Sequence, residues 1–431
     1  RFDFNTQEHY HVRCTECGNV YDVFMPPISD LLDRVTDSSD VELTHYDILF
    51  DQGEYYNPKF RRPDTNGEYI KEKGYATTLI TDHVIEWLEK NISDEKPFCV
   101  LVNHKAPHRN WMPDFPNMHL FEDVDFPEPE TLFDDYTTRG PQMKTQELTI
   151  DRHMGYAFDF KVRELKNEPT LQYIRDSWLM AMAEMDSEQR ATWEAIYDKK
   201  NEEFLKNPPV GKDLLRWKYQ RYVKEYCRTI RSVDEQVGRL LDYLEEKGVL
   251  DNTVIVYTSD QGFLLGEHGL YDKRFMYEES FRTPLIISCP SLVKKHSVCK
   301  ELVQNIDLAP TFLSLAGVEV PKEMSGRSLL PLFKNGKAEN WRNELYYHFY
   351  DYPAVGSVRK HDGIRTKRYK LIHWHGEGSG NDEAIDFWEL YDLKKDVMEV
   401  NNVYDNPKYV KVREALTVQL EKLRKDVGVT E

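Results

Sequence analysis

The stretch TVIVYTSDQGFLLGEHGLYDK (Thr253–Lys273) joins an apolar run to a cluster of polar side chains. The run TVIVY is rich in β-branched residues and predicts a buried strand. Functional groups of open α/β sheets gather at the carboxyl ends of strands, where Asp260 and Gln261 fall. A carboxylate and an amide oxygen suit Ca²⁺ or Mg²⁺, and His268 and Lys273 add donors for an anion. The stretch predicts part of a cation and anion site; the alternative is an ordinary turn with surface charges.

A second group of donors follows another apolar run. PFCVLVNH (Pro97–His104) predicts a buried strand, and it leads into the polar loop HKAPHRNWMP. Lys105 and His108 in this loop are suited to binding an anion or donating a proton. A single histidine in such a loop is more often structural, but three donors at a second strand end favour a site.

Composition limits the kinds of function. The chain has 431 residues, 40% of them hydrophobic, which predicts a globular protein with more than one domain. Its formal net charge of −18 argues against binding to nucleic acid or anionic membranes, so an anionic substrate needs a local basic pocket. No apolar run reaches the roughly 18 residues of a membrane span, and no signal peptide is recognised. Six cysteines are too sparse for a disulfide framework.

Strand and helix patterns divide the chain into three parts. Alternating strands and helices over residues 51–335 predict an α/β sheet, and the strand cluster of residues 336–431 predicts a smaller α+β subdomain. Residues 1–50 have a different pattern, with two strand-like pieces around a short helix. The clearest predicted helices cover residues 76–91, 214–248, 305–317 and 407–427.

Several motifs together resemble one family. They are GEYYNP, HKAPHRNWMP, DNTVIVYTSDQGFLLGEHGLYDKRFMYEESFRTPLIIS, SGRSLLPLF, HDGIRTKRYKLIHW and FWELYDLKKDVMEVNNVYDNPKY. From about residue 51 to the C-terminus the chain resembles sulfatases of the alkaline-phosphatase-like superfamily, above all bacterial sulfatases acting on N-acetylglucosamine-6-sulfate or similar glycans. The resemblance implies an incomplete alkaline-phosphatase-like sheet with helices on both faces. It also implies hydrolysis of sulfate monoesters on a sulfated carbohydrate.

The resemblance also implies roles for single residues. In the family, a cysteine of a C-x-P-S-R motif becomes formylglycine, whose hydrate attacks sulfur beside a Ca²⁺ ion. Asp260 and Gln261 match the later pair of calcium ligands. Lys273 matches the sulfate-binding lysine and His108 the histidine near the leaving group, while Lys105 and His268 lie in matching catalytic motifs.

Other family motifs are absent from the printed sequence. It contains no C-x-P-S-R or S-x-P-S-R motif, no early Asp–Asp metal pair and no G-K-W-H motif. All three belong to the N-terminal third of the family's fold. We therefore expect weak Ca²⁺ binding and sulfatase turnover near background for this chain alone.

Residues 1–50 resemble a different family. RFDFNTQEHYHVRCTECGNVYDV is similar to the metal-binding half of ferric-uptake and peroxide-sensing repressors. Cys14 and Cys17 supply thiolates suited to a structural Zn²⁺; the alternative is a hairpin with free thiols. The family's winged helix and second C-x-x-C are absent, so operator binding is not expected. The two resemblances indicate a composite chain, and a gene-level fusion, an assembly error and a deliberate chimera all stay open. The residues that match regulatory metal ligands are Asp3, His9, His11 and Asp22.

Basic and aromatic side chains are concentrated near the C-terminus, in YYHFYDYP, RKHDGIRTKRYK and HWHG. The resemblance implies that these segments line a sugar pocket, and the alternative is decoration of strand surfaces. The residues concerned are His348, Arg359, His361, Arg365 and His373.

Three other functions remain open from the sequence. They are a phosphate- or phosphonate-ester hydrolase of the same superfamily, a metal-sensing module built on residues 1–50, and a non-catalytic binder of sulfated glycans. A periplasmic or secreted location is expected for the sulfatase-like part. The sequence leaves the sugar, the linkage and the oligomeric state undetermined.

Overall fold

The computed structural model describes residues 10–13, 20–23, 47–50, 52–92, 96–162, 172–353, 355–380 and 382–429. The short helix predicted at residues 26–37 lies outside these residues. Asp3, His9, Cys14 and Cys17 lie outside them too. In the N-terminal segment, the backbones of β1 (Tyr10–Arg13) and β2 (Val20–Val23) pair antiparallel, with His11 opposite Asp22.

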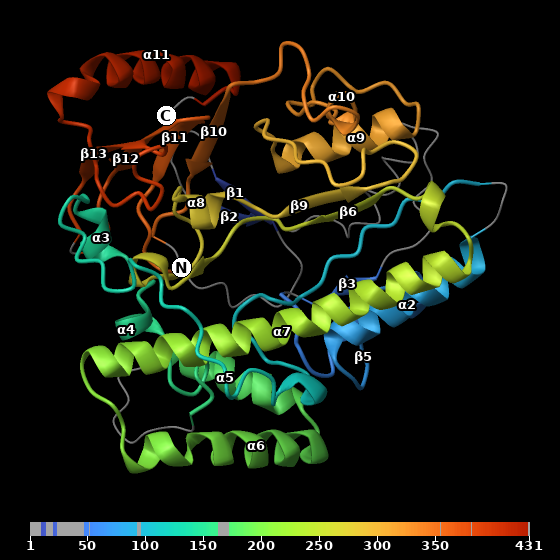
Figure 1. The fold of residues 1–431 in the computed structure, drawn as a ribbon. Coiled ribbons are helices and arrows are strands. Elements are labelled where there is room, and N and C mark those ends of the chain that lie inside the picture. Colours follow the sequence, from blue (N-terminus) through green and yellow to red (C-terminus); the bar gives the residue numbers. More distant parts are fainter. Residues whose placement is uncertain are drawn as a thin grey trace.

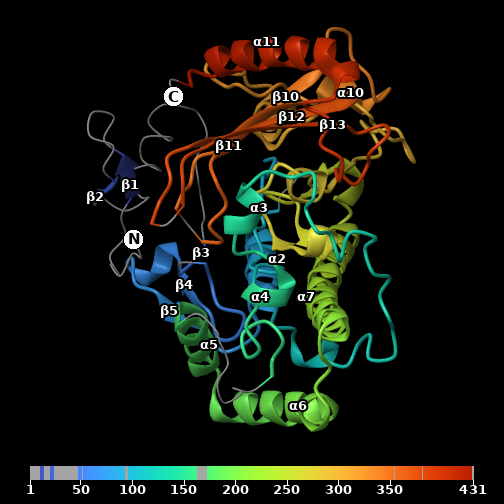
Figure 2. The ribbon, with the colours of Figure 1, turned by 90° about the vertical axis from the view of Figure 1, so that its left-hand side faces the viewer.

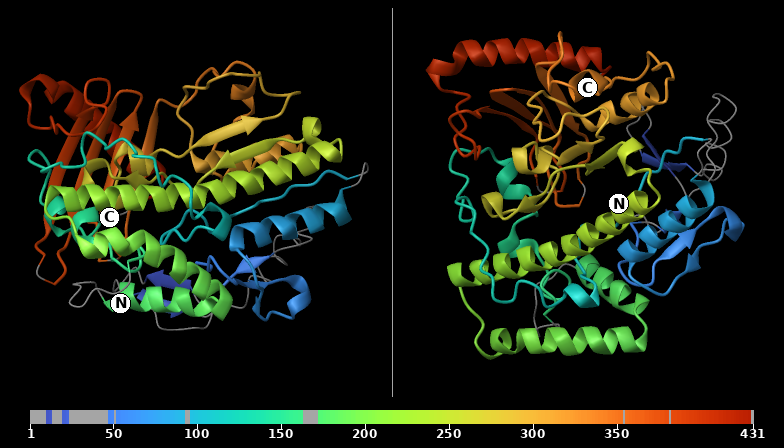
Figure 3. Two further views of the ribbon diagram at one scale, coloured as in Figure 1. Left: turned by 60° about the horizontal axis from the view of Figure 1, so that its bottom comes forward. Right: turned by 45° about the vertical axis from the view of Figure 1, so that its right-hand side comes forward.

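Helices form a layer across the lower half of Figure 1. The long helix α7 is amphipathic and runs beside α2 in both views of Figure 3. Leu88 of α2 packs against Tyr243 and Leu244 of α7, which joins the two helices. The helices of this layer are α2 (Ala76–Asn91), α5 (Gln172–Glu184), α6 (Ser187–Lys206) and α7 (Lys212–Glu246).

The run TVIVY forms strand β6 (Ile255–Thr258), as predicted. It pairs antiparallel with β9 (Leu285–Ser288), and Ile255 lies opposite Ser288. Helices α9 (Leu308–Leu315) and α10 (Leu330–Phe333) lie above this pair in Figure 1, and α7 lies below it. The pair therefore has helices on both sides, although Ile286 is 63% exposed.

The prediction of a buried strand at PFCVLVNH is wrong. Residues 97–104 form no strand, Cys99 is exposed, and Leu101 is 69% exposed. An apolar run becomes a buried strand only where neighbouring strands pair with its backbone, and no described strand pairs with this one. Phe98 and Val100 pack instead beside the end of the α2–α7 pair.

The C-terminal part forms a four-stranded antiparallel sheet in the order β10–β11–β12–β13. Helix α11 (Val410–Asp426) covers its outer face, as Figure 2 shows, through Leu416 and Leu420. The other face packs towards α8 (Glu278–Phe281). The strands are β10 (Glu344–Phe349), β11 (His361–Thr366), β12 (Tyr369–Gly376) and β13 (Ile385–Asp392).

Short elements connect these parts. They are β3 (Ile48–Leu49), β4 (Lys59–Arg61), β5 (Ile70–Lys71), α3 (Gln142–Thr145), α4 (Ile150–His153), β7 (Leu264–Leu265) and β8 (Tyr271–Asp272). The predicted helices at residues 76–91, 214–248, 305–317 and 407–427 are confirmed by α2, α7, α9 and α11. Among the helices that the structure describes, none is long and apolar enough to span a membrane.

Candidate anion-binding site

The loop after residue 104 brings Lys105 and His108 together. The Lys105 ammonium nitrogen lies 3.4 Å from Nδ1 of His108. The buried side chain of Tyr55 supports both residues: its hydroxyl donates to the carbonyl oxygen of His108 at 2.5 Å, and its ring lies 5.5 Å from Lys105 Nζ. The side chain of Tyr55 thus contacts both Lys105 and His108 and holds the loop in place.

An ion pair between Arg109 and Asp159 fixes the chain directly after His108. Arg109 donates from Nε and NH2 to the two carboxylate oxygens of Asp159, at 2.7 and 2.5 Å. The backbone N–H of Gly155 also donates to Asp159, at 2.7 Å. Asp159 is fully buried, and such a bidentate pair has a strict geometry. The peptide that follows His108 is therefore fixed in position.

Lys273 follows the short β7–β8 hairpin. Its ammonium nitrogen lies 3.7 Å from the Asp272 carboxylate and 5.9 Å from the ring of Phe263. Arg274 donates to the same carboxylate at 2.5 Å, so Asp272 is shared between two cations. Asp272 and Arg274 both have left-handed backbone conformations, with φ of 73° and 91°. The chain therefore turns sharply on each side of Lys273.

The positive charges of both lysines act on His108. Burial lowers the pKa of His108 to about 4, and the positive charges of Lys105 and Lys273 contribute in the same direction. The imidazole is consequently neutral at pH 7. Lys105 contacts this neutral imidazole and the charge of Lys273 acts on it, and such cationic hydrogen-bond donors have the chemistry that an anion such as a sulfate group requires.

Asp260 and Gln261 lie just beyond the end of β6, as predicted. The Asp260 carboxylate is exposed and accepts hydrogen bonds from Ser259 Oγ and the Gln261 N–H, both at Oδ1. Asn305 fixes the loop by donating to the carbonyl oxygens of Ser259 and Asp260, at 3.1 and 2.7 Å. The pair offers hard oxygen donors at a strand end, which fit Ca²⁺ or Mg²⁺ in chemistry.

At Gly262 this loop packs closely against α8. The Gly262 N–H donates to the carbonyl oxygen of Ser280 at 2.9 Å. A Cβ atom at this position would lie 2.2 Å from the carbonyl oxygen of Glu279 and 2.7 Å from that of Arg282. These are backbone atoms, so only glycine allows the loop that carries Asp260 to approach α8 so closely.

His268 lies in a separate buried network. Its Nδ1 is 2.9 Å from the Asp134 carboxylate, and its backbone N–H donates to Thr131 at 2.9 Å. Its carbonyl oxygen accepts from Tyr136 at 2.6 Å. These contacts favour a structural role for His268, which positions the β7–β8 hairpin that leads to Lys273.

The C-terminal residues of the proposed sugar pocket are divided between two faces of the sheet. His348 lies opposite Asp362 in the β10–β11 register and His361 opposite the next residue, Phe349, so the two histidines point to opposite faces. His361 is fully buried and stacks on Trp374 at 4.1 Å.

The remaining basic residues of that group are engaged in contacts of their own. Arg365 forms a bidentate pair with Glu278 at 3.2 and 3.0 Å. Arg359 is 3% exposed and donates to the carbonyl oxygen of Glu383 at 2.7 Å. Both arginines thus make contacts between segments of the chain, and their role in a sugar pocket stays a prediction.

Sequence reasoning missed three positioning residues. Tyr55 lies in the quoted motif GEYYNP but carries no predicted role, and nothing local marks Asp159 or Asn305 as partners of the site. Each acts through a contact between distant segments, for example residues 55 and 108 or residues 109 and 159. The tyrosine pair in GEYYNP is the one signal that could have been used.

Comparisons with known proteins give three family matches and several relatives. The family described as "Sulfatase" matches residues 37–318. The family described as "N-sulphoglucosamine sulphohydrolase, C-terminal" matches residues 266–426, and the "Ferric uptake regulator family" matches residues 1–50.

A curated N-acetylglucosamine-6-O-sulfatase of Bacteroides thetaiotaomicron is 45% identical over 386 residues, which cover 88% of this chain and 67% of that protein. Human N-acetylglucosamine-6-sulfatase is 40% identical over 124 residues, 28% of this chain and 22% of that enzyme. PehA of Trinickia caryophylli, a multifunctional alkaline phosphatase superfamily protein, is 35% identical over 196 residues, 43% of this chain and 36% of that protein.

Solved structures give the same result. One structure, described as a complex with its substrate D-glucosamine-2-N,6-O-disulfate, superposes with a TM-score of 0.82 at 44% identity. The superposition covers 90% of this chain and 77% of the other. A phosphonate monoester hydrolase from Silicibacter pomeroyi shares the fold at 20% identity, with a TM-score of 0.59 over 93% of this chain and 68% of the other.

Proposed function

The chain belongs to the sulfatase family, and on this premise we propose that Lys105, His108 and Lys273 bind the sulfate group of a 6-O-sulfated amino sugar. The observation that carries the proposal is the contact of the Lys105 ammonium with the half-buried, neutral imidazole of His108, whose pKa the positive charge of Lys273 also lowers. The similarity to an N-acetylglucosamine-6-O-sulfatase, and to a structure described with a disulfated glucosamine, supports this substrate class.

Family membership confirms the coarser predictions from the sequence. The chain has the α/β, alkaline-phosphatase-like sulfatase fold and belongs to the sulfuric ester hydrolases. Sulfatases generally use formylglycine and a divalent metal ion. The finer points, the Ca²⁺ identity, the residue roles and the turnover of these 431 residues, are parts of the proposal.

Each member of the cluster has a separate task in this proposal. The ammonium groups of Lys105 and Lys273 neutralise the sulfate oxygens. The bound sulfate adds negative charge beside His108, which favours the imidazolium and raises its pKa from about 4. A protonated His108 is then able to donate its proton to the departing sugar oxygen. Tyr55 and the Arg109–Asp159 pair keep the imidazole in place.

Asp260 and Gln261 would hold the divalent ion that the family uses. Such an ion polarises sulfate oxygens when it is bound. Ca²⁺ takes about six to eight oxygen ligands, and this pair supplies two side chains, so we propose that its affinity here is weak. The printed sequence also has no C-x-P-S-R motif, so we propose that sulfate release by these residues alone stays near background.

Substitution of Lys273 tests the proposed function. Lys273→Ala should weaken the binding of N-acetylglucosamine-6-sulfate about 10- to 100-fold, because a charge-assisted hydrogen bond contributes about 1.5–3 kcal/mol. Isothermal titration calorimetry measures the affinity. Lys90→Ala, which removes an exposed lysine from α2, is the matched control and should leave it unchanged.

Two further measurements in the same experiment distinguish sulfate binding from turnover and from a preference for phosphate esters. Unsulfated N-acetylglucosamine should bind far more weakly than the 6-sulfate, and ion chromatography should detect no sulfate release above the uncatalysed rate. Equal affinities of the wild type and Lys273→Ala would contradict the proposal. Tighter binding of N-acetylglucosamine-6-phosphate than of the 6-sulfate would favour the phosphate-ester alternative.

A further inference from the structure

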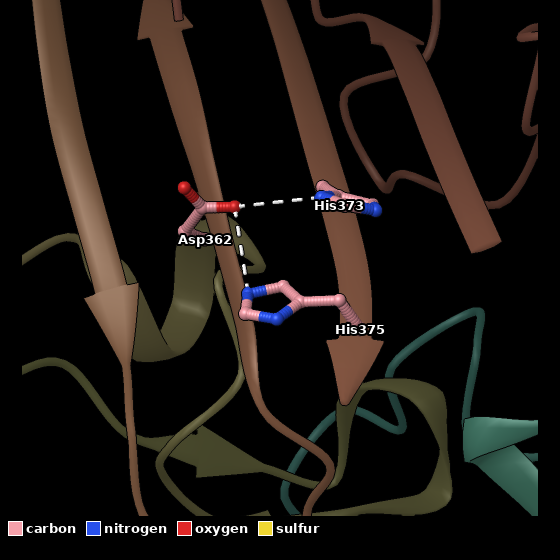
Figure 4. Close-up of side chains that lie close together, drawn as sticks. All are labelled: Asp362, His373 and His375. Atoms are coloured by element: carbon pink, nitrogen blue, oxygen red, sulfur yellow. Dashed lines mark ion pairs between the residues drawn. The ribbon is translucent and has the colours of Figure 1, made fainter. Parts of the chain in front are cut away.

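A second cluster of potential ligands lies on the outer face of the C-terminal sheet. Figure 4 shows Asp362 on β11 beside His373 and His375 on β12. Asp362 Oδ1 lies 3.9 Å from Nδ1 of His373 and 3.8 Å from Nε2 of His375. Ligand atoms of all three residues lie within 4.8 Å of one another. This face is covered by α11 and is opposite the face that carries His361.

The cluster is already oriented by neighbouring groups. His373 Nε2 is 3.0 Å from the Asp386 carboxylate, and its ring stacks on Trp388 at 3.9 Å. An Nε2–H that donates to Asp386 leaves a lone pair on Nδ1, which the Arg424 guanidinium contacts at 3.0 Å, and a histidine supported by a carboxylate in this way is common in metal sites. The Tyr346 hydroxyl donates to Asp362 at 3.0 Å and fixes that carboxylate as well.

The spacing suits a small ion. Tetrahedral coordination with bonds of about 2.0–2.1 Å separates ligand atoms by about 3.3–3.4 Å. The separations of 3.8 and 3.9 Å from Asp362 are about half an ångström too long, and all three ligand atoms lie within 4.8 Å, so side-chain rotations would have to bring them together around an ion. Asp362 is buried while both histidines are partly exposed, so an ion has access from solvent.

One cation already touches the cluster. Arg424 of α11 donates to both oxygens of Asp362, at 2.6 and 2.5 Å, and lies 3.0 Å from Nδ1 of His373. Two carboxylates, those of Asp362 and Asp386, lie beside the His373 imidazole, and Glu421 also pairs with Arg424, so a single guanidinium does not neutralise the three acids. A metal ion would share Asp362 with Arg424 and replace the contact of Arg424 with His373.

We propose that Asp362, His373 and His375 bind one divalent transition-metal ion, with Zn²⁺ as the best match. Two imidazoles and one carboxylate favour Zn²⁺ over Ca²⁺ or Mg²⁺, which prefer oxygen ligands alone. The ring of His348 lies 5.8 Å from that of His375 and places a further imidazole next to the ion. The ion would link β11 and β12 near the end of α11, on the sheet face remote from His361.

Zinc binding by the full chain tests this proposal. Titration against a chromophoric zinc chelator should give one equivalent of Zn²⁺ that is lost, or weakened by about 100-fold, in His373→Ala and in His375→Ala. Asp386→Asn should weaken it about 10-fold through the lost support of His373. His119→Ala, which removes an exposed histidine outside the cluster, is the matched control and should bind as the wild type does.

Two further measurements make the result specific. Cys14 and Cys17 are another potential zinc site, so Co²⁺ is used as a spectroscopic probe: the proposed site gives d–d bands without a thiolate charge-transfer band, and these bands disappear in His375→Ala. Thermal unfolding without metal separates folded variants from unfolded ones. Arg424→Met should bind Zn²⁺ more tightly, because the competing guanidinium is gone. Equal zinc stoichiometry in the wild type and both histidine variants, or weaker binding in Arg424→Met, would overturn the proposal.

Discussion

Replacing Gly262 with alanine should destabilise the protein by about 3 kcal/mol or more, at the upper end of the cost of overpacking. The added methyl group would lie 2.2 Å from the carbonyl oxygen of Glu279 and 2.7 Å from that of Arg282. Both are backbone atoms of the α8 region, so the clash is not relieved by rotating a side chain. Urea unfolding followed by tryptophan fluorescence measures the loss of free energy of unfolding.

Gly238→Ala provides a control with the opposite sign. Gly238 lies inside α7, and nothing would lie within 4 Å of an added Cβ atom there. Alanine in a helix interior is more favourable than glycine by about 0.5–1 kcal/mol, so this variant should be more stable than the wild type. A Gly262→Ala variant as stable as the wild type would show that the loop after β6 does not approach α8 as described.

Replacing Asp159 with alanine should cost about 3–5 kcal/mol, because it leaves a buried guanidinium without its partner. Arg109 makes two charge-assisted hydrogen bonds to Asp159, whose carboxylate is fully buried. The same change should weaken binding of a sulfated sugar, since Arg109 directly follows His108 in the site. Urea unfolding and calorimetric titration measure the two effects.

Glu86→Ala is the matched control for that prediction. Glu86 forms an exposed ion pair with Lys90 at 2.6 Å on the surface of α2, and such pairs contribute about 0.3–0.5 kcal/mol. The larger loss of stability in Asp159→Ala than in Glu86→Ala is therefore a consequence of the burial of the Arg109–Asp159 pair. A loss of stability in Asp159→Ala no greater than that in Glu86→Ala would contradict the role of the Arg109–Asp159 pair.

Much of the fold was predictable, because periodicity is a local property. The helix predicted at residues 76–91 matches α2, and the strand cluster and last helix of the C-terminal part were also predicted. The run at residues 97–104 failed for a physical reason. Its apolar composition is typical of a buried strand, but strand formation depends on neighbouring strands, which the sequence of the run does not reveal.

Candidate site residues could be predicted from the sequence only where they lie in a loop that follows an apolar run. Lys105, His108 and Lys273 were selected from the loops after two apolar runs; the structure places Lys105 next to His108, and the charge of Lys273 acts on the same imidazole. His268 and Arg365 were selected by type, yet their partners Asp134 and Glu278 make contacts that favour structural roles. Those partners lie far away in the sequence, so composition and spacing contain no information about them.

The most direct test of the central claim follows the His108 imidazole by NMR during pH titration. The free protein should show a His108 pKa of about 4, below its ordinary value of about 6.5. Saturating N-acetylglucosamine-6-sulfate should raise that pKa, because the added negative charge stabilises the imidazolium, and its affinity should increase as the pH falls through the raised pKa. Unsulfated N-acetylglucosamine should leave the pKa unchanged. An identical His108 pKa with and without the sulfated sugar would contradict the assignment of Lys105, His108 and Lys273 as the sulfate-binding site.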